Sequence, residues 1–158
     1  MKHHLLLFLL LPVALNAQKI TKETEPITGQ SWWITNEVIL GRPGLSPLIA
    51  YFRSTPQGAL IYLNPKSMEI IGTADIAVML TATDTVIARS TGVQMANLST
   101  YWREYRITRS DLEKLAQSPV LKVTLTHFDG IEEVAVPDKN QPKLMLWAKA
   151  LLQETSGN

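Results

Sequence analysis

The stretch that decides the fold is 121-LKVTLTHFDGIEEVAV-136, two β-type runs on either side of Asp129 and Gly130. An Asp-Gly pair between alternating apolar residues is a strong signal for a two-residue hairpin turn. Such a turn sets Leu125 opposite Val134, so that apolar side chains meet on one face of the hairpin. The segment therefore predicts two antiparallel strands that contribute one buried sheet face.

Upstream of this hairpin the chain alternates short β-type runs with turn residues. The runs are rich in β-branched and aromatic residues, and Gly, Pro, Asn and Asp separate them. The predicted strands span residues 32–39, 49–54, 59–63, 76–81, 85–90 and 101–108.

Two segments have helical periodicity instead. Ser110 and Glu113 form a capping box at the start of a short helix that ends before Pro119. Asn140 is placed to cap a final helix over about 141–154, whose apolar residues recur at helical spacing.

These elements predict an α+β domain: a mainly antiparallel β-sheet of six to eight strands with a short helix and a C-terminal helix. Both helices come late in the chain, which argues against a parallel, doubly wound sheet. The alternative is a β-sandwich or partly open barrel with attached helices, since a sheet this long is able to fold over on itself.

Residues 1–17 have the pattern of a secretory signal peptide. Lys2 precedes an apolar run from Leu5 to Leu15, and the small residue Ala17 follows. A helix of that run is about 16 Å long, about half of a bilayer's hydrocarbon core. We expect cleavage after Ala17 and export to the periplasm or the extracellular space.

The rest of the chain divides simply. Residues 18–30 are polar and predict a flexible leader or a loosely attached edge segment. Residues 31–154 form the single globular domain, and 155–158 form a disordered tail. About 140 residues suffice to bury a sizeable core without disulfides.

Composition excludes several classes of function. The chain has no cysteine, which rules out disulfides, thiolate ligands and a lipoprotein anchor. Its 15 basic and 14 acidic side chains form no like-charge block, so neither nucleic acid nor anionic lipid is an expected partner. No further stretch is long and apolar enough to span a membrane. We expect no metal and no cofactor, because histidines are few and glycine-rich phosphate loops are absent.

His127 is the one histidine beyond the signal segment, and the predicted register places it opposite Glu132. A carboxylate in that position orients an imidazole and raises its pKa, as in a general acid–base pair. The commoner role of such a pair is structural, and no nucleophile or oxyanion site accompanies it.

Aromatic residues offer the candidates for binding. In the strand 101–108, alternation places Tyr101, Arg103 and Tyr105 on one face, an exposed platform for a sugar or a peptide if the opposite face is buried. Trp32 and Trp33 are neighbours on a strand, so one of them must point away from the core.

In the final helix, Leu146 and Ala150 lie on the side away from the main apolar stripe. We expect them to be covered by the fold or to form an interface, with a homodimer as one form of that interface.

The sequence favours a secreted or periplasmic, non-enzymatic module that binds a protein or a glycan. One alternative is a small hydrolase or isomerase that uses His127 with Glu132. A structural subunit of an envelope assembly is the other alternative.

Overall fold

A computed structural model describes residues 20–41, 48–64, 76–97, 100–127 and 130–156. The expected signal peptide at 1–17 and the last two residues lie outside this part of the chain. The elements, in chain order, are β1 (Ile20–Thr24), β2 (Ser31–Thr35), β3 (Val38–Ile39), β4 (Ile49–Thr55), β5 (Gly58–Asn64), β6 (Ile76–Thr81), β7 (Thr85–Asn97), β8 (Thr100–Thr108), α1 (Arg109–Gln117), β9 (Val120–His127), β10 (Gly130–Ala135) and α2 (Gln141–Ser156).

All ten of these strands belong to one open antiparallel sheet. The strand order is β1-β2-β4-β5-β8-β7-β6-β9-β10, and β3 pairs with β4. The α+β prediction with a mainly antiparallel sheet is confirmed, whereas the expected six to eight strands were too few. The described strands form one open sheet that runs from β1 to β10, and not the two packed sheets of a sandwich. The additional strands are the short β3 and β1, which lies in the expected leader.

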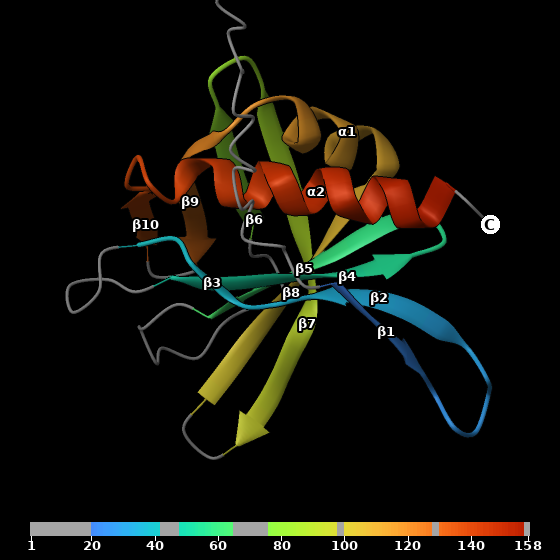
Figure 1. Cartoon of the computed structure of the whole chain (residues 1–158). Coiled ribbons are helices and arrows are strands. Elements are labelled where there is room, and N and C mark those ends of the chain that lie inside the picture. Colours follow the sequence, from blue (N-terminus) through green and yellow to red (C-terminus); the bar gives the residue numbers. More distant parts are fainter. Residues whose placement is uncertain (1–19, 42–47, 65–75, 98–99, 128–129, 157–158) are drawn as a thin grey trace, which may run out of the picture.

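Helices α1 and α2 pack against each other and cover the same face of the sheet (Figure 1). We call this face the inner face. Strand alternation directs Phe52, Ile61, Tyr105 and Val123 to it, and all four are fully buried in the main core. The opposite, outer face carries a smaller apolar cluster over β4, β5 and β8.

The β9–β10 hairpin forms, with a register two residues away from the predicted one. Leu125 pairs with Glu132 and not with Val134, and His127 pairs with Gly130. The residues between that last pair, 128 and 129, lie outside the described part of the chain. A shift of two residues keeps every side chain on its predicted face, so Leu125 and Val134 are still buried.

Regular structure at both ends of the described part reaches into the segments predicted as a leader or edge segment and as a tail. Ile20–Thr24, within the predicted leader, pairs with β2 along its whole length and forms an edge of the sheet. Helix α2 continues to Ser156, into the segment predicted to be a disordered tail. Helix α1 begins earlier as well: Thr108, and not Ser110, is its N-cap, and its hydroxyl accepts from the Asp111 N–H.

Candidate ligand-binding groove

Strands β2 and β4 part from each other soon after they meet. Their ladder has one residue pair, Ile34 with Arg53. On either side of this pair, backbone N–H groups donate to side-chain hydroxyls and not to backbone carbonyls. The Trp33 N–H donates to Ser54 Oγ at 2.8 Å, and the Phe52 N–H donates to Thr35 Oγ1 at 2.9 Å. These side chains satisfy the backbone donors at the parting, which allows the strands to splay without leaving buried groups unpaired.

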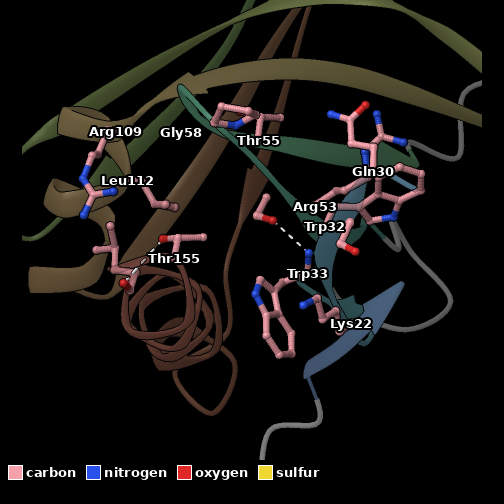
Figure 2. A pocket seen from close by; sticks show the side chains of 14 residues that line it. Lys22, Gln30, Trp32, Trp33, Arg53, Thr55, Gly58, Arg109, Leu112 and Thr155 are labelled. Carbon is pink, nitrogen blue, oxygen red and sulfur yellow. Dashed lines mark hydrogen bonds between the residues drawn. The ribbon is translucent and has the colours of Figure 1, made fainter. Parts of the chain in front are cut away.

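A groove of about 430 Å³ opens beside this parting. Strands β1, β2 and β4 form one wall, the β4–β5 turn forms the end, and the start of α1 with the last turns of α2 forms the other wall (Figure 2). Its lining residues are Lys22, Gln30, Ser31, Trp32, Trp33, Arg53, Ser54, Thr55, Pro56, Gly58, Arg109, Leu112, Leu152 and Thr155.

Both tryptophans of the predicted pair line this groove. Trp33 points to the inner face, where it packs against the edge of the main core, and Trp32 points to the outer face. Each ring is half-buried. A cation lies over each ring: Lys22 Nζ is 5.8 Å from the Trp33 ring centroid, and the Arg53 guanidinium carbon is 5.3 Å from the Trp32 centroid.

The charged residues that line the groove are all cations, and from outside the lining Glu23 Oε2 accepts from Trp32 Nε1 at 3.4 Å. Lys22, Arg53 and Arg109 line the groove, and none of its lining residues is acidic. Two carboxylates approach the arginines from outside the lining, Glu104 at 3.9 Å from Arg53 and Glu113 at 3.5 Å from Arg109. Arg109 Nη2 also donates to Ser156 Oγ at 3.0 Å, and the Arg53 guanidinium carbon also lies 5.5 Å from the Tyr62 ring centroid. Partly exposed ion pairs are weak, so a ligand anion competes with these existing contacts for the two guanidinium groups.

Gly58 holds the end wall of the groove in place. It has φ +147°, and a Cβ atom built on it would lie 2.3 Å from the Ile107 carbonyl oxygen and 2.8 Å from the Arg109 nitrogen. A side chain does not fit there, because the β4–β5 turn touches the backbone at the start of α1. The Arg109 N–H donates to the Gln57 carbonyl across the same contact.

An aromatic cluster on the outer face continues from the groove. Tyr51 and Tyr62 are stacked with centroids 4.5 Å apart, and Trp102 meets Tyr51 edge-on at 4.9 Å. The Tyr62 hydroxyl donates to Glu104 Oε2 at 2.7 Å. Burial raises the pKa of Tyr51 to about 12. Burial and then the Glu104 hydrogen bond raise the pKa of Tyr62 still further. Neither phenol is ionised near neutral pH.

In the expected platform of Tyr101, Arg103 and Tyr105, the latter two residues are buried. Arg103 and Tyr105 are 1 % and 0 % exposed, because their face of β8 is the inner face beneath the helices. Trp102 lies on the outer face, where its own cluster covers it. The side chain of Tyr101 lies outside the described part. The sequence showed the alternation correctly and could not show which face the helices cover.

The predicted His127–Glu132 pair is not a directly opposed pair. Glu132 stands opposite Leu125, and the backbone of His127 stands opposite Gly130, so the two residues are diagonal neighbours. The His127 side chain lies outside the described part. Glu132 does not line the groove.

Leu146 and Ala150 are each half-buried on α2. The large apolar side chains that are most exposed within the globular part lie elsewhere, and include Leu80, Ile87 and Ile131 on the outer face. The interface role of Leu146 and Ala150 stays a prediction.

The described residues include neither a metal-binding cluster nor a membrane-spanning helix. No group of three or more His, Asp or Glu side chains among them is arranged to hold a metal ion. None of their helices is long and apolar enough to cross a bilayer.

Sequence reasoning missed Lys22, Arg53 and Arg109 as site residues. They lie far apart in the chain, on β1, β4 and α1, and no motif connects them. Lys22 fell in the segment expected to be a leader. Of the groove residues, only Trp32 and Trp33 were predicted from the sequence, because two adjacent aromatic residues on a strand must point to opposite faces.

No known family matches this sequence, and comparisons with curated proteins and with solved structures also find no match.

Proposed function

We propose that this chain is an exported, non-enzymatic binding module, and that its ligand occupies the groove between β2, β4 and the two helices. The observation that supports the proposal best is the placement of Trp32 and Trp33, half-buried rings from one strand that line the same groove. Partly exposed tryptophans beside hydrogen-bonding groups are typical of binding sites, because the flat ring contributes area and the polar groups orient the ligand.

The described residues that line the groove are suited to binding a ligand. Its lining supplies hydroxyls, an amide and cations, but no carboxylate or imidazole that would act as a general base. The hydroxyls, the amide and the cations of the lining support recognition of a ligand as the proposed role.

Native affinity electrophoresis tests the proposal. The probes are dextran, xylan, pectin and alginate as glycans, and gelatin and casein as polypeptides. We expect at least one probe to retard the protein, and Trp32→Ala to weaken that retardation at least about five-fold, since stacking on one aromatic ring contributes about 1 kcal/mol.

Ile87→Ala is the matched control. Ile87 is 53 % exposed on the outer face and does not line the groove, so its truncation removes exposed apolar surface without touching the site. Retardation by none of the six probes contradicts the binding proposal. Equal weakening by Trp32→Ala and Ile87→Ala contradicts the placement of the ligand in the groove, and favours a structural subunit instead.

Tryptophan fluorescence provides an independent measurement. The chain has four tryptophans, and the other two, Trp102 and Trp147, are buried at 8 % and 5 % exposure. A ligand in the groove should protect Trp32 and Trp33 from acrylamide quenching, and the buried pair should contribute no change.

Intact-mass spectrometry tests export: the chain secreted by a host should have a mass that lacks residues 1–17.

A further inference from the structure

The charged residues of the groove indicate the charge of the ligand that it binds. Lys22 comes from β1, Arg53 from β4 and Arg109 from α1, so three separate elements each direct one cation to the same space. Figure 2 shows Arg109 on the helical side of the groove, with Lys22 and Arg53 on the strand side. The three cations attract an anionic ligand, which binds in competition with Glu104 and Glu113, the carboxylates that pair with the two arginines.

Spacing of the cations favours a ligand with more than one anionic group. They stand on both sides of a groove of about 430 Å³, and each arginine already has a carboxylate behind it. An extended molecule that carries acidic groups along its length reaches both sides.

The uncharged part of the lining distinguishes a sugar from a peptide. Two tryptophan rings and the hydroxyls of Ser31, Thr55 and Thr155 suit the flat faces and the hydroxyl groups of sugar rings. A peptide that adds as a strand needs free backbone groups along the parting of β2 and β4. There the Trp33 N–H is already bonded to Ser54 Oγ at 2.8 Å.

We propose that the ligand is an acidic oligosaccharide, bound through its carboxylate or sulfate groups by Lys22, Arg53 and Arg109 while Trp32 and Trp33 contact its rings. This inference rests on the proposed function and makes it specific. Lys22 and Arg109 are exposed and Arg53 is partly exposed, so the ion pairs form in a wet site and are sensitive to salt.

Isothermal titration calorimetry with matched sugars tests the charge requirement. The probes are tetragalacturonate, its neutral methyl ester, a chondroitin sulfate tetrasaccharide and hexaglutamate. We expect an acidic sugar to bind at least about 10-fold more tightly than the ester, a difference of about 1.4 kcal/mol. Raising the NaCl concentration from about 50 to about 500 mM should weaken the acidic sugar several-fold and leave the ester unchanged.

Charge variants locate the effect. Lys22→Gln and Arg109→Gln should each weaken binding of the acidic sugar about 5- to 10-fold and leave binding of the ester unchanged. Lys149→Gln and Arg106→Gln are the matched controls, because both side chains are exposed and neither lines the groove. Equal effects of groove and control variants would show that overall charge, and not the groove, attracts the sugar, and would overturn the inference.

The two proposals fail in different ways. If the ester binds as tightly as the acid and Trp32→Ala weakens both, the groove binds sugars and the charge inference is wrong. If hexaglutamate binds more tightly than either acidic sugar, the ligand is an acidic peptide and the sugar inference is wrong. A preference for tetragalacturonate or for the sulfated sugar supports the inference and identifies the anionic group.

Discussion

Gly58→Ala should be the most damaging small substitution in the groove. Two costs add at this position. The φ of +147° is a conformation that an L residue adopts only under strain, at about 1–3 kcal/mol. The new Cβ would also lie 2.3 Å from the Ile107 carbonyl oxygen, and relieving such overpacking costs about 1–3 kcal/mol more. We expect a total loss of about 4 kcal/mol in the free energy of unfolding.

Gly130→Ala separates the two costs. Gly130 has nearly the same φ, +150°, but a Cβ there meets nothing within 4 Å. We expect it to lose about 2 kcal/mol, from backbone strain alone. A chain of this length loses about 3–4 °C of Tm per kcal/mol. Differential scanning calorimetry should therefore show a fall of about 14 °C for Gly58→Ala and about half of that for Gly130→Ala.

The clash at Gly58 also bears on the groove. Its relief requires the β4–β5 turn to move away from the start of α1, where Arg109 begins the helical wall. Gly58→Ala should then weaken ligand binding as well as stability, whereas Gly130→Ala should affect stability alone. Equal Tm losses in the two variants would refute the close contact between the turn and α1.

Three further predictions concern hydrogen bonds and ionisation near the groove. Ser54→Ala removes the acceptor of the Trp33 N–H and should cost about 1–2 kcal/mol in urea unfolding, whereas Ser31→Ala, which removes an exposed hydroxyl pair, should cost less than about 0.5 kcal/mol. Tyr62→Phe removes a bond to a carboxylate in a ring that is 1 % exposed and should cost about 1.5 kcal/mol; a loss no greater than that of Tyr51→Phe would contradict this. Burial raises the pKa of Tyr51 from 10.0 to about 12, so the unfolded phenol ionises first, and stability present below pH 10 should be lost as pH rises toward 12. Ultraviolet titration should show a phenolate step near pH 12 that is missing in Tyr51→Phe.

Local pattern was enough to locate most of the elements. The strand predicted over 76–81 forms with those bounds, and the hairpin at 121–136 pairs the predicted strands in an antiparallel manner. The register of that hairpin was missed by two residues, because Asp129-Gly130 is a statistical turn signal and the pairing extends to Gly130 itself. Each side chain still lies on its predicted face, because strand alternation has a period of two and the register differs by two residues.

The candidate site was much less accessible to sequence reasoning. The pattern of β8 correctly separated Tyr105 from Trp102, but the face of the sheet on which α1 and α2 pack decided which of them is buried in the main core. The platform was therefore assigned to the wrong face. Trp32 and Trp33 were found because they are adjacent, and adjacency is a property of the sequence.

By itself the sequence determined the periodicities: which segments are strands, which are helices, and which side chains share a face of each. Backbone geometry enforces these relations within a few residues, and so they can be read locally. The tertiary structure alone decided that β1 lies beside β2, that β2 and β4 part after one residue pair, and that Lys22, Arg53 and Arg109 meet at one groove. Those contacts join residues far apart in the chain, and they depend on how the whole core packs.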